Sequence, residues 1–152
     1  MKRFKMVLVL ITVIVFFSCD DDRDDIDLSA AEANAMNLMV QEGEWSISKF
    51  SQNGSDKTAL YEDYIFIFEK ENNFSAISSL EEVNGTWRIS NDAGSEFDAY
   101  DDVDFNIYFS SNGKLSELTR NYDVISATNN LIQLNLEMNQ NGDTVVLSFS
   151  KN

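Results

Sequence analysis

The residues of this chain that could do chemistry are mostly carboxylates. The sequence has 152 residues, with 26 Asp and Glu, 11 Lys and Arg, no His and a single cysteine, Cys19. A His-based catalytic triad, an internal disulfide and the usual His/Cys zinc site are therefore excluded. Paired carboxylates alone can hydrolyse glycosides, but these acids fall in predicted loops or on outward-facing strand positions rather than around a cleft. We predict no catalytic residues and no enzyme activity.

One acidic stretch, with Asp98, Asp101, Asp102 and Asp104, raises the question of a cation site. Calcium prefers several carboxylate oxygens, yet the spacing lacks the glycine and the terminal Glu of an EF-hand loop. A solvated acidic loop is the favoured interpretation, and we predict no metal or other cofactor. The formal charge of −15 also argues against a nucleic-acid partner, because nothing in the chain could neutralise a run of phosphates.

The N-terminus has the features of an export signal. Lys2, Arg3 and Lys5 form a positive region, and an apolar run follows over residues 6–17. That run is too short to cross a bilayer as a helix, which takes about 20 residues. We therefore predict that residues 1–18 are a signal peptide.

Cys19 follows Ser18 directly after the apolar run. A small residue followed by Cys at this boundary resembles the lipobox of bacterial lipoproteins, in which the Cys is lipidated through its sulfur and the signal is cut before it. The resemblance implies that Cys19 is a lipid anchor, and two or more acyl chains hold a protein stably on a membrane. A cleaved secretory signal with an incidental Cys and an uncleaved anchor remain as alternatives.

Six Asp follow Cys19 within residues 20–27. Like charges at this density repel one another, so an extended, hydrated tether is predicted over residues 19–28. Loss of the signal would leave a formal charge of −18, so the lipid must supply nearly all the membrane affinity. In one Gram-negative phylum, acidic residues after the lipidated Cys resemble a signal for the outer leaflet. The resemblance therefore implies an outer-membrane lipoprotein of the bacterial cell envelope, which either faces the periplasm or is exposed at the cell surface.

A single domain over residues 29–152 follows the tether and begins with one short helix. Ser29 and Glu32 form a capping-box pair, residues 30–41 are good helix formers, and Gly43 is a plausible stop. This spacing predicts an amphipathic helix that lies against whatever follows it.

From Glu44 onward, apolar residues alternate with polar ones, which is typical of antiparallel strands with one buried face. Short polar turns at Glu71-Asn72-Asn73, Asn112-Gly113 and Asn139–Gly142 predict hairpins. The predicted strands lie near residues 45–48, 64–69, 74–79, 85–90, 103–110, 115–125, 132–138 and 145–149. Eight such strands favour an all-β, up-and-down antiparallel barrel, with a two-sheet β-sandwich as the alternative.

Gly43-Glu44-Trp45 at the first strand resembles the lipocalin signature. In that family the Trp plugs the closed end of the barrel, and a basic residue near the last strand packs over it. The resemblance gives this role to Trp45, with Lys151 or Arg120 as its cation. The order of motifs over residues 43–152, including Gly85-Thr86-Trp87, is similar to bacterial lipocalin-like lipoprotein domains.

A lipocalin-like barrel is either a filled core or a cup for one small ligand. If there is a pocket, its lining is apolar, which suits a lipid-like or aromatic molecule. Leu60 and Tyr61 lie on a long connection over residues 52–63, which is predicted either as a mobile lid over the open end or as a loop that packs these two residues on its rim. The predicted interior ligand-binding residues are Phe66, Phe68, Trp87, Phe105, Phe109 and Tyr122. The many large side chains favour a filled interior over an open pocket.

Two functions follow from this interpretation. The first is a lipid-anchored, lipocalin-like protein of the cell envelope that binds a small hydrophobic ligand in its barrel. The second is a non-catalytic interaction module with a filled barrel, which docks another envelope protein or a glycan. The expected partners are the membrane, through the N-terminal lipid, and either a small hydrophobic ligand or an envelope protein.

Overall fold

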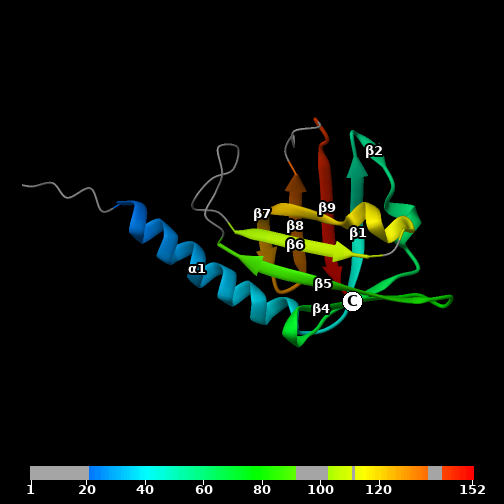
Figure 1. Cartoon of the computed structure of the whole chain (residues 1–152), viewed down its shortest axis with the longest axis horizontal. Helices are drawn as coiled ribbons and strands as arrows, with labels where there is room; N and C mark the ends of the chain where they lie inside the picture. The colour runs from blue at the N-terminus through cyan, green and yellow to red at the C-terminus, as the bar shows by residue number, and fades with distance from the viewer. Residues whose placement is uncertain (1–20, 92–102, 111, 137–141) are drawn as a thin grey trace, which may run out of the picture.

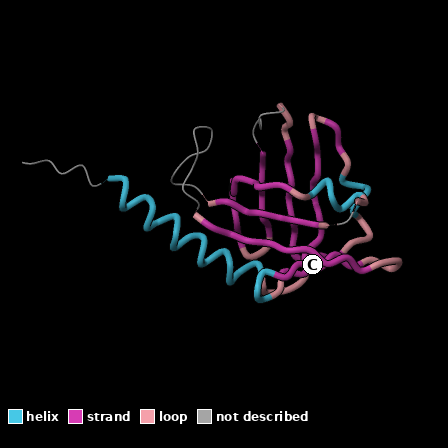
Figure 2. The backbone as a smooth tube through the Cα atoms, in the orientation of Figure 1, coloured by secondary structure: helices cyan, strands magenta, loops and turns pink. Residues whose placement is uncertain are grey.

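The computed structural model of the chain describes residues 21–91, 103–110, 112–136 and 142–152. Its elements follow one another as neighbours along a meander (Figures 1 and 2). In order, they are α1 Asp21–Val40, β1 Trp45–Gln52, β2 Ser55–Asp56, η1 Thr58–Tyr61, β3 Ile65–Phe68, η2 Lys70–Asn72, β4 Asn73–Ile77, β5 Glu82–Ser90, β6 Asp104–Phe109, η3 Lys114–Leu118, β7 Arg120–Thr128, β8 Leu131–Leu136 and β9 Val145–Lys151. The three η elements are 3-10 turns.

The sheet closes on itself at β1. This strand pairs antiparallel with β9 from Trp45↔Lys151 to Gln52↔Val145, and with β3 at Trp45↔Phe66. The fold is therefore a closed, eight-stranded antiparallel barrel preceded by one helix, with β2 as a two-residue strand on the edge of β1. The all-β barrel prediction is confirmed, and the sandwich is excluded because its two layers would leave free edges.

Strand alternation sorts the side chains as predicted. Along β6, Phe105, Ile107 and Phe109 are buried in the core, whereas Asn106 and Tyr108 are exposed. Because the side-chain period of a strand is two, this pattern places one row of every strand inside the barrel. The core is thus continuous along the barrel axis.

The predicted strand over residues 115–125 is wrong in its first half. Leu115 and Leu118 lie instead on η3, whose turns are closed by Ser116 N–H to Gly113 O at 3.0 Å and Thr119 N–H to Ser116 O at 3.1 Å. A 3-10 helix repeats every three residues, so the Leu-x-x-Leu spacing buries both leucines on one side. The connection from β6 to β7 is consequently a turn of helix, not the tight Asn-Gly hairpin predicted.

The helix begins earlier than predicted. α1 starts at Asp21 rather than near Ser29, so most of the acidic segment is helical instead of extended. Acidic residues in a first turn interact favourably with the helix dipole, which offsets part of their mutual repulsion. A 20-residue helix is about 30 Å long, and its N-terminal half extends away from the barrel in Figure 1. No helix in the described ranges has both the length and the apolar composition needed to cross a membrane.

The remaining predicted turns have different outcomes. The β3–β4 hairpin is confirmed, with Glu71 and Asn72 at positive φ in η2. Most of the Asn139–Gly142 turn and the long connection at residues 92–102 lie outside the described residues.

Candidate functional site

We use the name closed end for the barrel end beside the last turn of α1, where Trp45 lies. Its side chain is fully buried, and its Nε1 donates a hydrogen bond to Val40 O at the end of α1, at 2.9 Å. Lys151 lies over the ring, with Nζ 5.6 Å from the ring centroid. Gly43 has φ of +102°, a conformation that favours glycine, and a Cβ there would sit 2.7 Å from Lys151 Cε and displace the end of that side chain from its place over the ring. These contacts give the Gly-x-Trp spacing a physical reason.

Arg120, the other cation considered for this role, lies at the start of β7. Its Nη1 donates to Thr119 O at 2.8 Å, and its Nε is buried without a hydrogen-bond partner in the structure. The cation over the Trp45 ring is therefore Lys151.

The predicted interior ligand-binding residues pack against one another. Phe68, 1 % exposed, is their hub. Its ring lies 5.5 Å from Trp87, 5.4 Å from Phe105 and 5.6 Å from Phe149, measured between centroids. These rings come from β3, β5, β6 and β9, so they meet across the barrel. Aromatic rings prefer such edge-to-face and tilted contacts, and here they occupy the space that a ligand would need.

Phe66, Phe109 and Tyr122 extend the same filled core. Phe66 packs against Phe149 at 5.4 Å, and Phe109 against Phe74 at 5.1 Å. Tyr122 is fully buried, and its hydroxyl donates to Leu118 O at 2.9 Å. Burial raises the pKa of Tyr122, although the positive charge of Arg120 opposes the shift.

The mouth of the barrel is closed by η1 and η3. The Tyr61 hydroxyl donates to Lys114 O at 2.8 Å, and Lys57 Nζ makes an ion pair with Glu117 Oε2 at 2.7 Å. Tyr61 is fully buried, and burial raises its pKa with a further contribution from the charge of Glu117. Leu60, its predicted companion in the lid, is 47 % exposed. As the meander predicts, the 52–63 connection and the Asn112-Gly113 connection lie at the same end.

Two threonine hydroxyls substitute for strand pairing at this mouth. Thr58 Oγ1 accepts a hydrogen bond from Phe50 N–H at 2.9 Å, and Thr119 Oγ1 accepts one from Phe109 N–H at 2.9 Å. In each case the neighbouring strand has ended and a 3-10 turn occupies its place. The backbone groups of both phenylalanines are satisfied in this way, as burial requires.

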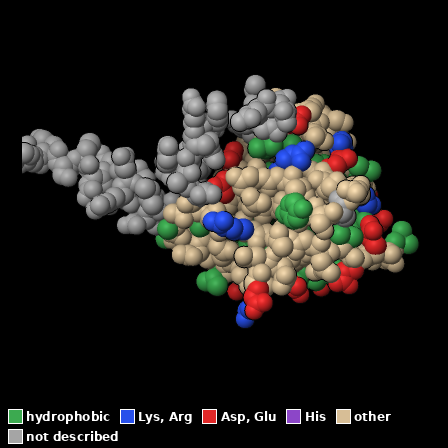
Figure 3. All heavy atoms as spheres, in the orientation of Figure 1, with side chains coloured by type: hydrophobic (Ala, Val, Ile, Leu, Met, Phe, Trp, Pro, Cys, Tyr) green, Lys and Arg blue, Asp and Glu red, His purple; other side chains and the backbone are tan. Residues whose placement is uncertain are grey.

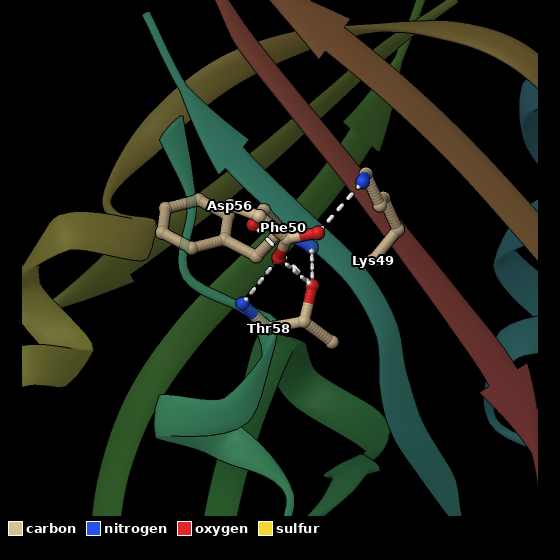
Figure 4. Close-up of polar contacts among 4 residues, drawn as sticks. All are labelled: Lys49, Phe50, Asp56 and Thr58. Carbon is tan, nitrogen blue, oxygen red and sulfur yellow. Dashed lines mark hydrogen bonds and ion pairs between the residues drawn. The ribbon is translucent and has the colours of Figure 1, made fainter. Parts of the chain in front are cut away.

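Asp56 fixes the geometry of the contact between Thr58 and Phe50 (Figure 4). Its Oδ1 accepts from Thr58 N–H at 2.9 Å and from Thr58 Oγ1 at 2.6 Å, while Oδ2 pairs with Lys49 Nζ at 2.9 Å. The hydrogen bonds from Thr58, followed by the one from Lys49, hold the pKa of Asp56 well below its usual range. The 52–63 segment, predicted as a mobile lid or a loop packed on the rim, therefore contains the regular elements β2 and η1.

A recessed groove lies outside the barrel, between α1 and β7, and two of its lining residues, Met36 and Val103, also belong to the buried core. Its volume is about 610 Å3. Its lining comes from one side of the helix, from Val103 before β6, and from the end of β7 with its turn. The lining residues are Glu32, Ala35, Met36, Met39, Val103, Val124, Ile125, Ser126, Ala127, Thr128 and Asn129. Sequence analysis did not predict this site.

A β-bulge shapes the β7 wall of the groove. Val124 pairs with Leu134 and Ser126 with Gln133, so Ile125 is an extra residue in the ladder. A bulge redirects side chains locally, and Ile125 is 59 % exposed at the groove.

The acidic residues considered for calcium give no described site. Asp104 is 3 % exposed, and its Oδ1 accepts from Asn121 Nδ2 at 2.9 Å. Asp98, Asp101 and Asp102 lie outside the described residues. Within the residues that the structure covers, no three Asp, Glu, Cys or His side chains gather as metal ligands. Cys19 also lies outside the described residues.

Comparison with known proteins supports the fold. No family model matches the chain, and no curated protein sequence matches it. A solved structure of a DUF4847 family protein from Bacteroides vulgatus is similar, with a TM-score of 0.50 and 15 % identity. The alignment covers 77 % of this chain and 97 % of that one. At this identity the likeness extends to the fold alone.

Proposed function

We propose that this protein is a lipid-anchored, non-catalytic component of the bacterial cell envelope that binds a small apolar ligand in the groove between α1 and β7. The observation that carries the proposal is a recessed groove of about 610 Å3 beside a barrel interior occupied by its own aromatic rings. Small-molecule sites in proteins are mostly apolar and measure about 300–1,000 Å3. This proposal keeps the predicted ligand class and moves the site from the barrel to its outer wall.

The groove lining suits a ligand of irregular shape. Met39 is partly buried and Met36 is 5 % exposed in the lining, and methionine side chains are flexible and polarizable, so they adjust to different apolar surfaces. Ala35 and Ala127 are exposed and small, which leaves space between the helix and the strand. The small side chains of Ala35 and Ala127 therefore keep the groove open.

The anchor part of the proposal rests on Cys19, which precedes the first residue of α1 by two positions. A lipid there would join the membrane to the end of α1 that extends from the barrel in Figure 1. The test is the intact mass of the protein extracted from bacterial membranes. We expect loss of residues 1–18 and addition of acyl groups at Cys19. A mature chain without lipid, or one that retains its signal, would contradict this part.

Ligand binding is tested on residues 19–152 carrying Cys19→Ser, which keep every described residue. The neutral fluorescent probe N-phenyl-1-naphthylamine should bind saturably. Ala35→Trp, which fills the groove, should weaken binding at least tenfold. Ala31→Trp is the matched control, because Ala31 is exposed on the same helix and does not line the groove. Equal binding by wild type and Ala35→Trp would refute the groove as the site.

The interaction module remains the second candidate, and one observation favours it. Leu80 is 93 % exposed at the tip of the β4–β5 hairpin, the right-hand end of the molecule in Figures 1 and 3. Leu60 and Ile65, 47 % and 37 % exposed, add apolar surface at the mouth end. Native mass spectrometry of protein from its own envelope distinguishes the candidates. A small co-purifying molecule supports the groove, and a protein partner lost in Leu80→Asp supports the hairpin.

A further inference from the structure

The charge in the groove indicates which ligands it should select. Resting on the proposed function, we infer that the groove prefers amphiphiles with an apolar body and a cationic amine head over matched carboxylates. The inference comes from the sign and the position of the one charged residue in the described lining, Glu32.

The position of Glu32 allows its carboxylate to contact the head group of a ligand bound in the groove. Glu32 lies four residues before Met36 and seven before Met39, so the three side chains share one face of α1. Glu32 is exposed, and the described residues offer it no hydrogen bond or ion pair. A ligand whose apolar body covers the methionines would therefore reach this carboxylate with its polar end.

The rest of the lining offers an anion no compensating charge. The polar groups at the β7 end are Ser126, Thr128 and Asn129, all uncharged, and no described lining residue is basic. After loss of residues 1–18 the chain has a formal charge of −18, which adds a field that attracts cations and repels anions. Opposite charges across an interface favour binding, while like charges suppress it.

Three ligands with the same ten-carbon chain test the inference: decylamine and decanoate, each below its micelle concentration, and decanol, below its solubility limit. Displacement of the neutral fluorescent probe reports their affinities. We expect decylamine to bind about five- to tenfold more tightly than decanol, and decanoate to bind more weakly than decanol. Because Glu32 is exposed, the preference for decylamine should shrink as salt is raised.

Glu32→Gln should bring the affinity of decylamine close to that of decanol and leave decanol itself unchanged. Glu42→Gln is the matched control, since it removes the same charge from an exposed position just after α1 that does not line the groove. It should keep most of the preference. An amine preference that survives in Glu32→Gln, or equal affinities of the amine and the carboxylate, would overturn the inference.

The two proposals fail in different ways. If decanol binds and Ala35→Trp blocks it, but Glu32→Gln changes nothing, only the charge selection is wrong. If decanol does not displace the probe, or displaces it equally from Ala35→Trp, the groove is not the ligand site and both proposals fail. A dimer in native mass spectrometry that Ala35→Trp abolishes would assign the groove to a second copy of the chain and overturn the inference.

Discussion

The barrel interior and the α1–β7 groove are both lined mainly by apolar residues, yet the interior is filled and the groove is open. Inside the barrel, rings from different strands lie 4.5–6.1 Å apart, and their side chains are almost fully buried. In the groove, Ala35 and two methionines of α1 lie opposite the bulged strand β7, and about 610 Å3 remains. Large aromatic side chains therefore fill the interior, whereas small side chains and a bulged strand leave the groove open.

The largest expected difference between the two regions is in stability. Phe68→Ala removes the hub of the ring cluster and should lower the free energy of unfolding by about 3–5 kcal/mol, because the cavity cannot collapse fully. Ile125→Ser in the groove should change it by about 0.5 kcal/mol or less, since that side chain is 59 % exposed. Urea unfolding at neutral pH measures both. Similar losses from the two variants would contradict the comparison.

The threonine contacts at the mouth should give the next largest effect. Thr58→Val leaves Phe50 N–H without its acceptor and should cost about 1–3 kcal/mol. Thr119→Val does the same to Phe109 N–H, so it should cost a similar amount. Neither variant should change probe affinity in the groove by more than about twofold. A loss of probe binding with either variant would show that the mouth and the groove act as one site.

Alkaline pH should weaken the barrel. The pKa of buried Tyr122 is raised above its unfolded value of about 10, so its contribution is complete below pH 10 and is lost as the pH rises further. The free energy of unfolding should then fall by up to about 1.4 kcal/mol per pH unit for this residue. Tyr122→Phe should be less stable at neutral pH and show a shallower alkaline decline. If the free energy of unfolding of this variant fell as steeply with rising pH as that of the wild type, another group would be the cause of the alkaline loss of stability.

The smallest effect is expected at the closed end. Lys151→Met removes the cation over Trp45 and should cost about 0.5–1 kcal/mol, the range for a partly exposed cation–π contact. Urea unfolding measures the loss, with Lys70→Met as a control at an exposed position on η2. A change of probe affinity in Lys151→Met would show that the closed end and the groove are coupled through α1.

The sequence pattern predicts the barrel and its filling. Strict alternation, as in Phe105, Ile107 and Phe109, assigns the inward faces because a strand has only two of them. The order of short strands without crossover helices then leaves few closed topologies. Where alternation is absent, prediction fails: η1 and η3 depend on local hydrogen bonds such as those of Thr58, which apolar periodicity does not reveal.

The groove could not be predicted because it joins distant parts of the chain. Its helix side comes from residues 32–39 and its strand side from residues 124–129, and nothing in either segment specifies the other. One local signal was present. Val124 and Ile125 are adjacent apolar residues in a strand whose apolar and polar residues otherwise alternate, and such a break in the alternation indicates a bulge.

The central claim is that a ligand occupies the groove and leaves the barrel filled. After removal of residues 1–18 the chain keeps three methionines, Met36, Met39 and Met138, and both tryptophans. The most direct test is an NMR titration of residues 19–152 carrying Cys19→Ser with N-phenyl-1-naphthylamine, observing methionine methyl and tryptophan indole signals together. We predict saturable shifts of the Met36 and Met39 methyls, with the Trp87 indole unmoved. A shifted Trp87 indole with unmoved Met36 and Met39 methyls would place the ligand in the barrel and contradict the account.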